Sequence, residues 1–269
     1  MRLYSFNING LRARPHQIEA LGAQADIIAL QEIKVDNDQF PHQVINDLGW
    51  QAANHGQKGH YGVANLSRQP ALAVRKGFAW RGDDEQARLI ETDHSTSQGT
   101  LTLINGYFPQ GENRNHETKF PLKVQFYADL LERVKSMPDD ALFAVVGDMN
   151  VAFQDSDIGI GEPNRKRWLS QGKCAFLPEE REWMQALLDA GLVDTFRLHH
   201  PSEDNLFSWF DYRSRGFQDD PKRGLRIDYV LASPALAKLC QGAGIDYQVR
   251  GMEKPSDHAP IWADFDLDL

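Results

Sequence analysis

Short apolar runs alternate with polar breaks along the whole chain, and their length predicts β-strands. The runs are rich in Val, Ile, Leu and aromatic residues and are bounded by Gly, Pro, Asn or Asp, which is typical of strands between turns. They lie at residues 3–6, 26–31, 61–66, 99–107, 141–148, 227–233 and 259–266. Other segments are predicted to be helices, either because their apolar residues are spaced three and four apart or because they carry the residues that typically start and end a helix. These segments are residues 16–25, 122–136 and 178–191.

The order of these elements favours an α+β fold. Strands outnumber helices and follow one another without a helix between them, which argues against a doubly wound parallel sheet. The chain has 269 residues, 41% of them hydrophobic, which is enough for a large core. We expect one compact domain over residues 1–269, and two similar halves meeting near residues 130–140 are consistent with the pattern.

Composition and charge limit the binding partners and the cellular compartment that we expect for the protein. A net charge of −9 and a pI near 5.5 do not favour nucleic-acid binding by bulk charge. Basic residues do cluster at 164–168, 212–217 and 221–226, although any one such cluster is more often a solvated loop. No apolar run approaches the roughly 20 residues that span a bilayer, and the N-terminus does not resemble a signal peptide. Two isolated thiols, Cys174 and Cys240, suit a reducing compartment, so we expect a cytoplasmic protein without membrane contact.

Polar residues recur where the predicted strands begin or end. One Asp or Asn at such a position is ordinary turn chemistry, and so is the pair Asp257-His258 in "PSDHAPIWADF" when taken alone. Many such positions on separate strands indicate a site, because packed sheets bring their strand ends to a common rim. The positions are Asn7, Asn9, Gln31, Glu32, Tyr107, Asp148, Asn150, Asp228, Asp257 and His258.

These side chains are mostly hard oxygen donors, which suit Mg²⁺ or Mn²⁺. Zinc is less favoured because the chain has no HExxH and no CxxC motif. It also lacks the GxSxG elbow of serine hydrolases and the GxxxxGK[ST] loop of P-loop NTPases. The chemistry that remains is metal-assisted hydrolysis of a phosphate ester.

Several motifs in order along the chain resemble the bacterial exonuclease III family. They are "LQEIKV", "NGYFPQGE", "GDMN", "DIGIGEPNRKRW", "GKCAFLPEEREWM", "VDTFR", "FSWFDYRS", "RGLRID" and "KPSDHAPIW", and the match extends from "SFNINGLRARPHQ" to the C-terminus. The resemblance implies a DNase I-like, four-layered α/β sandwich of two mixed sheets flanked by helices, with the active site at one rim.

The resemblance also implies an activity. The expected enzyme is a monomeric DNA-repair hydrolase that depends on Mg²⁺, with Mn²⁺ as a substitute. Its expected substrate is double-stranded DNA with abasic sites or blocked 3′ ends. The implied activities are 3′→5′ exonuclease releasing 5′-mononucleotides, apurinic/apyrimidinic endonuclease, and 3′-phosphatase or 3′-phosphodiesterase.

The same resemblance implies residue roles. Glu32 is the principal metal ligand, Asp148 activates the attacking water, and His258 contacts the scissile phosphate while Asp228 holds its imidazole. The implied metal set is Asn7, Glu32, Asp148, Asn150, Asp257 and His258. The implied catalytic set is Tyr107, Asp148, Asn150, Asp228 and His258. The implied DNA contacts are Asn9, Arg12, Gln110, Trp209, Leu225 and Ile227, with Trp209, Leu225 and Ile227 lining an apolar pocket for the abasic sugar.

Two alternatives stay open on the sequence. One is a phosphatase or phosphodiesterase acting on lipid headgroups, nucleotides or RNA tails, and the other is a DNA-binding module without catalysis. The segments "FSWFDYRSRGF" and "RGLRID" pair aromatics with arginines, as nucleic-acid binders do. Ile33, Leu198 and Lys222 depart from the usual family residues and bear on DNA contacts and loop shape rather than on the reaction.

Overall fold

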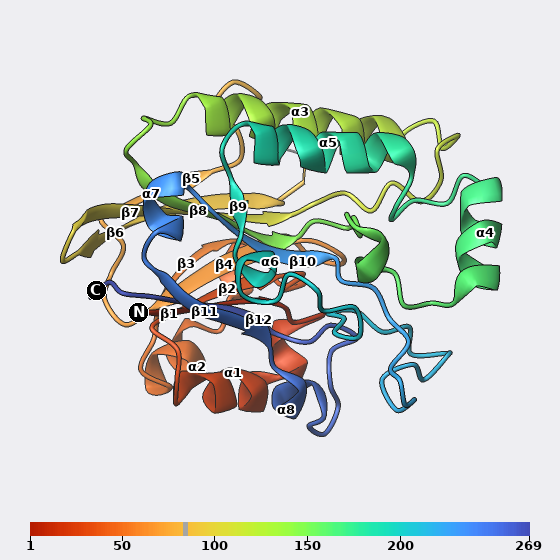
Figure 1. Cartoon of the computed structure of the whole chain (residues 1–269). Coiled ribbons are helices and arrows are strands. Elements are labelled where there is room, and N and C mark those ends of the chain that lie inside the picture. The colour runs from red at the N-terminus through yellow and green to blue at the C-terminus, as the bar shows by residue number, and fades with distance from the viewer. Residues whose placement is uncertain (83–85) are drawn as a thin grey trace.

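Two mixed six-stranded sheets pack face to face in the computed structural model, which describes residues 1–82 and 86–269 (Figure 1). The first sheet has the order β11-β12-β1-β2-β4-β3. Its strands are β1 (Arg2–Asn7), β2 (Ile27–Gln31), β3 (Gln51–His55), β4 (Val63–Ser67), β11 (Cys240–Ile245) and β12 (Ile261–Phe265). This sheet therefore contains strands from both the N-terminal and the C-terminal parts of the chain.

The second sheet has the order β5-β6-β7-β8-β10-β9. Its strands are β5 (Ala73–Lys76), β6 (Leu89–Thr96), β7 (Gly99–Tyr107), β8 (Leu142–Asp148), β9 (Val193–Asp194) and β10 (Asp228–Ala232). β7 and β8 are parallel, whereas β10 runs antiparallel to β8. Residues 130–140, where two similar halves could meet, do not mark a change of sheet, because β7 and β8 on either side pair with each other.

Helices cover the outer faces of both sheets (Figure 1). α1 (Pro15–Gly22), α2 (His42–Asp47) and α8 (Tyr247–Arg250) lie below the first sheet in this view. α3 (Lys119–Lys135) and α5 (Pro178–Asp189) lie above the second sheet, and α4 (Glu162–Ser170) projects at the right edge. The remaining short helices are α6 (Thr195–His199), α7 (Pro234–Ala237), and the 3₁₀ turns η1 (Leu11–Ala13), η2 (Asn37–Gln39) and η3 (Asp155–Asp157). This confirms the expected helix–sheet–sheet–helix sandwich.

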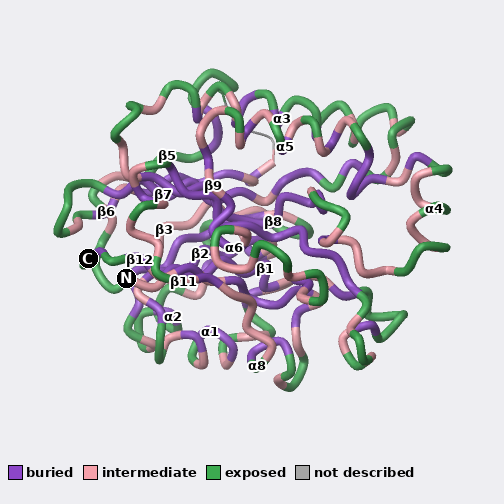
Figure 2. Tube along the Cα trace, viewed as in Figure 1, coloured by how far each residue is buried: buried purple, intermediate pink, exposed green. Residues whose placement is uncertain are grey.

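Apolar side chains fill the three spaces between the four layers. Leu3 and Ile27 of the first sheet and Leu103 and Val146 of the second belong to the inter-sheet cluster. Two further clusters join each sheet to its helices. Figure 2 shows the buried backbone concentrated along the sheets, with the exposed segments at the periphery. Burial on both faces explains why the central strands appear in the sequence as continuous apolar runs.

A polar chain of hydrogen bonds crosses this apolar interior. Gln31 Nε2 donates to Asn105 Oδ1 at 2.8 Å, and Asn105 Nδ2 donates to Asn65 Oδ1 at 2.9 Å. The chain continues from Asn65 Nδ2 to Thr92 Oγ1 at 2.9 Å, and Thr92 Oγ1 lies 2.8 Å from His94 Nε2. All five side chains are buried, so these bonds satisfy groups that would be costly to bury alone.

Every predicted strand and helix is present, with ends shifted by a few residues. The strands that the sequence pattern did not predict are β3, β5, β6, β9 and β11. Among the described residues, no helix is long and apolar enough to cross a membrane.

Candidate active site at the rim of the sandwich

The strand register brings the predicted polar residues to one rim, defined here by the ends of β1, β2, β7 and β8 and the starts of β10 and β12. Asn7 and Gln31 are partners at the ends of parallel β1 and β2. Tyr107 and Asp148 are partners at the ends of parallel β7 and β8, and Asp228 pairs with Asp148 across antiparallel β10. The expectation that separate strands deliver these residues to a common place is therefore met.

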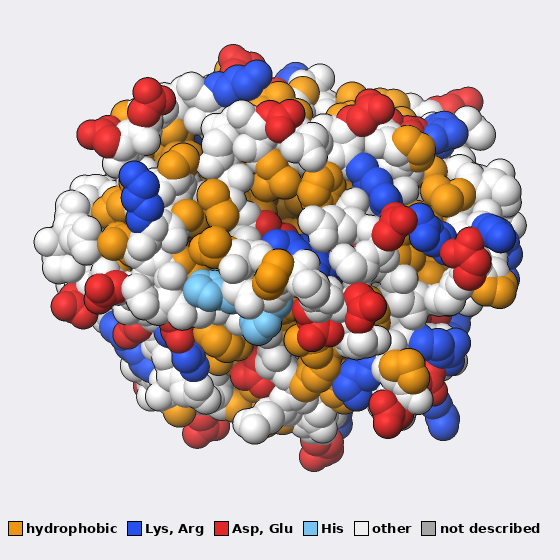
Figure 3. Space-filling model, in the orientation of Figure 1, with side chains coloured by type: hydrophobic (Ala, Val, Ile, Leu, Met, Phe, Trp, Pro, Cys, Tyr) orange, Lys and Arg blue, Asp and Glu red, His pale blue; other side chains and the backbone are white. Residues whose placement is uncertain are grey.

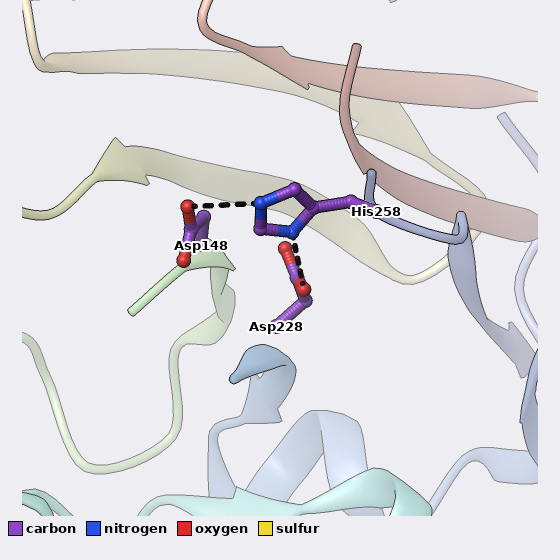
Figure 4. Close-up of side chains that lie close together, drawn as sticks. All are labelled: Asp148, Asp228 and His258. Atoms are coloured by element: carbon purple, nitrogen blue, oxygen red, sulfur yellow. Dashed lines mark hydrogen bonds and ion pairs between the residues drawn. The ribbon is translucent and has the colours of Figure 1, made fainter. Parts of the chain in front are cut away.

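His258 lies between two carboxylates from the opposite sheet (Figure 4). Its Nδ1 lies 2.8 Å from Asp228 Oδ2, and its Nε2 lies 3.7 Å from Asp148 Oδ2. All three side chains are buried, with 2–4% of their surface exposed. The short contact at Nδ1 fixes the ring orientation and leaves Nε2 facing Asp148.

The electrostatics of this trio favour a charged imidazole. Burial alone would lower the pKa of His258, but the carboxylates of Asp228 and Asp148 outweigh it and raise the pKa to about 10. Burial raises the pKa of Asp148 to about 7, an effect that the charge of Asp228 increases and that of His258 decreases. Near neutral pH the site therefore holds an imidazolium beside a carboxylate that gains or loses a proton easily.

Glu32 and Asp148 are linked through Asn7. Asn7 Nδ2 donates to Glu32 Oε2 at 3.1 Å and to Asp148 Oδ2 at 3.0 Å, while its Oδ1 accepts the backbone N–H of Asn9 at 3.1 Å. Asn7 thus bridges two carboxylates as a donor in this structure. Burial, assisted by the charges of Glu32 and Asp148, raises the pKa of the Tyr107 phenol well above its ordinary value, so the phenol keeps its proton.

Backbone strain gathers at the same rim. Asn9, Glu32, Lys34 and Asn150 have positive φ angles of 48°, 54°, 57° and 53°. Such angles are uncommon outside glycine and concentrate at functional sites. Asn150 is held there by its N–H, which donates to Asp148 Oδ1 at 3.0 Å, and by its Nδ2, which donates to the Phe108 carbonyl at 3.0 Å.

Asp257 faces a different set of neighbours from His258. Its Oδ1 accepts from Asn9 Nδ2 at 2.9 Å, and its Oδ2 accepts from Trp209 Nε1 at 3.1 Å. Burial opposes ionisation, but the charge of His258 and these two hydrogen bonds lower the pKa of Asp257 below its ordinary value. An ionised Asp257 therefore ties the Trp209 loop to the rim.

The donor set fits a divalent cation. One carboxylate oxygen each of Asp148 and Asp228 and a ring nitrogen of His258 lie within 4.8 Å of one another, and the two carboxylates are the donors in this trio while His258 is charged. Asp228 Oδ1 is buried without a hydrogen-bond partner among the described residues, and Glu32 is partly exposed beside Asn7. Several carboxylates with few compensating cations are the environment that Mg²⁺ or Mn²⁺ prefers.

The predicted DNA-contact residues fall into three groups, the first of which is Asn9, held at the rim by its hydrogen bond to Asp257. Arg12 and Gln110 are exposed, and Arg12 Nη2 donates to Gln39 Oε1 at 3.0 Å. Leu225 and Ile227 are buried in an apolar cluster against which Trp209 packs. A pocket of about 140 Å³ adjoins Trp209, but Leu225 and Ile227 do not line it; its other lining residues are Ile160, Asn164, Arg167, Trp168, Asp211, Ser214 and Arg223.

Three supporting residues at the rim are not among those predicted from the sequence. Lys34 Nζ lies 3.0 Å from Glu32 Oε1 and donates to Asn9 Oδ1 at 2.6 Å. Ser208 Oγ accepts the N–H of Asp228 at 3.1 Å, and Ser256 Oγ donates to the Asn7 carbonyl at 2.7 Å. The position of Lys34 directly after "QEI" was a usable signal, whereas a buried serine has no sequence mark.

Comparisons with known proteins place the chain in a family. Residues 4–258 match the model of the endonuclease/exonuclease/phosphatase family. The chain is 56% identical over 268 residues to exodeoxyribonuclease III of Haemophilus influenzae, covering 98% of this chain and 100% of that protein. A 3′ phosphatase from Neisseria bound to a product DNA hairpin superposes with a TM-score of 0.90 at 37% identity, covering 99% of both chains. An AP endonuclease from Archaeoglobus fulgidus gives 0.88 at 32% identity, again covering 99% of both chains.

Proposed function

The chain belongs to the endonuclease/exonuclease/phosphatase family and is a DNA-repair nuclease, and on that premise we propose that one centre at the rim carries out its phosphodiester hydrolysis. The observation that supports this centre best is the placement of His258 between Asp228 and Asp148. In this arrangement the carboxylate of Asp148 can accept a proton, and the imidazolium of His258 is a cation that a phosphate can approach.

In this proposal Asp148 accepts a proton from the attacking water, and Asn150 orients that water. The imidazolium of His258 donates a hydrogen bond to a phosphate oxygen and stabilises the negative charge of the transition state. Asp228 keeps the ring charged and oriented through the 2.8 Å contact. Tyr107, which keeps its proton, donates to the phosphate or to the leaving oxygen.

Glu32 and Asp148 are the carboxylates proposed to hold the metal most directly, with Asn7, Asn150, Asp257 and His258 around them. A bound Mg²⁺, or Mn²⁺ in its place, would polarise the phosphate and offset the charge that develops on it. Asn7 acts here by holding Glu32 and Asp148 together through its amide nitrogen. Asp257 acts by holding Asn9 and Trp209.

We propose double-stranded DNA with abasic sites or blocked 3′ ends as the substrate. Trp209 would contact an extruded abasic sugar, whose extrusion is cheap because no base pairing or stacking remains at that nucleotide. Asn9, Arg12 and Gln110 would contact the strand, and Leu225 and Ile227 would support Trp209 from beneath. A monomer acting in the cytoplasm as a single domain completes the proposal.

Nicking of plasmid DNA tests both the substrate and the metal. Plasmid with abasic sites should be nicked with Mg²⁺ or Mn²⁺ and left intact with EDTA or Ca²⁺, while plasmid without lesions is cut more slowly. Asp148→Asn should retain its fold and its binding to abasic DNA but lose several orders of magnitude of turnover. Full activity in excess EDTA, or an Asp148→Asn enzyme with more than about a tenth of wild-type turnover, would remove the proposed centre.

A further inference from the structure

Arg250, at the end of α8, is a buried cation without an anionic partner. Only 4% of its surface is exposed, and its Nε is buried without a hydrogen-bond partner. No carboxylate lies within 4.0 Å of its guanidinium in residues 1–82 and 86–269. Arg226, equally buried, shows the usual arrangement, because Asp157 and Asp194 both bind it at 2.7 Å.

Aromatic rings surround the Arg250 guanidinium. Its Cζ lies 4.5 Å from the ring centroid of Phe217 and 5.5 Å from that of Phe210. Ring faces attract a cation, but they replace only part of the hydration that a buried charge loses. Burial accordingly lowers the pKa of Arg250, although Tyr212, Asp257 and Tyr247 act in the opposite direction. A charge that is costly to bury and lacks a partner is a functional signal.

Arg250 opens onto a pocket of about 340 Å³. Arg215 and Gln218 add an exposed guanidinium and an exposed amide to its lining, and Asp211 adds one carboxylate. The other lining residues are Tyr212, Phe217 and Pro255. With two arginines against one carboxylate, the pocket is set to receive one negative charge.

The pocket adjoins the catalytic rim. Tyr212 donates its hydroxyl to the carbonyl of Pro255 at 2.8 Å, and Phe210 N–H donates to the carbonyl of Asp257 at 2.9 Å. A strand that enters the rim at His258 therefore passes the loop that carries this pocket. The loop near residues 211–223 is drawn in light blue at the lower right of Figure 1, and Lys and Arg side chains occur on that side in Figure 3.

We propose that the Arg250 pocket is a subsite for a backbone phosphate of the DNA strand, separate from the catalytic centre. This rests on the proposed function, because it assumes that DNA lies across the rim. A phosphodiester carries the single negative charge that the pocket lacks, and Arg250 and Arg215 can each donate to its oxygens. The contact positions the strand without reading its sequence.

DNA binding to Arg250→Met, measured by fluorescence anisotropy in EDTA at several salt concentrations, tests the subsite. Binding to a duplex hairpin should weaken on the order of tenfold, and the slope of log K against log[salt] should fall by about one. Arg215→Gln should act in the same direction, and Arg250→Lys should restore part of the loss. The charge-matched control Lys238→Gln, beyond the opposite end of β10, should bind as wild type does.

Thermal stability separates this role from a purely structural one. Because Arg250→Met removes a buried unpaired charge, its Tm should equal or exceed that of the wild type. A lower Tm with an unchanged salt slope would show that Arg250 serves packing against Phe210 and Phe217, and the subsite would be rejected.

Two further outcomes bear on the ligand. Titration with inorganic phosphate that depends on Arg250, combined with an unchanged DNA salt slope, would assign the pocket to free phosphate and overturn the DNA subsite. If the wild type cleaves abasic DNA and all variants bind like it, only the subsite fails. A wild type that neither binds nor cleaves DNA would instead overturn the proposed function.

Discussion

At the residue scale, the site depends on a few contacts that make polar groups act as one unit. His258 receives its orientation from Asp228 at 2.8 Å, and its raised pKa from the charges of Asp228 and Asp148. In the proposed mechanism, removing either member of the Asp228–His258 pair therefore removes the function of the other.

Substitutions in this pair should accordingly be non-additive. His258→Ala and Asp228→Ala should each lower kcat by about 10²–10⁴-fold. The double variant should be little worse than either single one, because the two residues perform one task. Steady-state kinetics on abasic duplex give the three values, and Asp228→Asn provides a control of matched shape. Fully additive losses would mean that Asp228 does not work through His258.

Trp209 should discriminate between DNA and small substrates. Trp209→Ala removes a stacking surface worth about 1–3 kcal/mol and should reduce kcat/KM on abasic DNA far more than on a small phosphodiester. Trp209→Phe keeps an aromatic face but loses the 3.1 Å hydrogen bond to Asp257, so it separates stacking from loop positioning. Equal losses on both substrates for Trp209→Ala would assign Trp209 to the fold or the metal centre.

The residues proposed to carry chemistry were easier to locate from the sequence than the residues that hold them in place. Asp148, Asp228 and His258 were predictable because charged residues at strand boundaries stand out against apolar runs. Ser208 and Ser256 were not predictable, since a serine becomes informative only when its hydroxyl meets a particular backbone group. Asn7 was predictable as a site residue, but its donor orientation toward Glu32 depends on the packed backbone.

At the element scale, the sequence pattern predicted every interior strand except β6, whose sequence "LIETDHST" is largely polar, and it predicted no edge strand. β2 and β8 lie inside their sheets, are buried on both faces, and therefore consist of continuous apolar residues. β5 and β11 lie at sheet edges and are less buried than the central strands. Their sequences, "AVRK" and "CQGAGI", therefore contain exposed or small residues and no continuous apolar run. These edge strands form because they pair with a neighbouring strand, and the residues of the edge strand alone do not predict that pairing.

Two outer helices also support the rim through a buried ion pair. Lys123 of α3 and Glu180 of α5 are fully buried, with Nζ and Oε1 2.5 Å apart. Lys123 Nζ also donates to the Asn150 carbonyl at 2.8 Å, and Glu180 Oε2 accepts the N–H groups of Ala175 and Leu177. The pair thus connects the helix layer to the loop that follows β8.

Removing one charge of this pair should lower the stability of the fold more than removing both charges. Lys123→Met leaves the buried charge of Glu180 without its partner and should lower the free energy of unfolding by about 3–5 kcal/mol. Lys123→Met/Glu180→Gln should recover much of that loss. Urea denaturation measures all three proteins, and Asp129→Asn on the same helix, whose partner Arg81 is exposed, is the control with a smaller effect. A double variant less stable than Lys123→Met would contradict this account.

At the scale of the whole molecule, the two sheets are joined by the polar chain that ends at His94 as well as by apolar packing. Burial lowers the pKa of His94 from 6.5 to about 4, while the nearby charge of Asp93 acts in the opposite direction. The folded protein therefore holds a neutral imidazole against Thr92 at pH values where the unfolded chain is already protonated at this position.

The sign of the pH dependence follows from that difference. Above about pH 6.5 both states have neutral His94, so the residue adds no pH dependence. Between about pH 6.5 and pH 4 only the unfolded state takes up the proton, so stability falls as the pH falls, by up to about 3 kcal/mol.

His94→Gln should remove this part of the acid sensitivity. As the pH falls, the stability of the variant should therefore decrease less than that of the wild type. Urea unfolding at several pH values from 7.5 to about 4.5 measures the difference, and His42→Gln, at an exposed position, should parallel the wild type throughout. Parallel curves for His94→Gln and wild type would show that protonation of His94 does not oppose the packing of the two sheets.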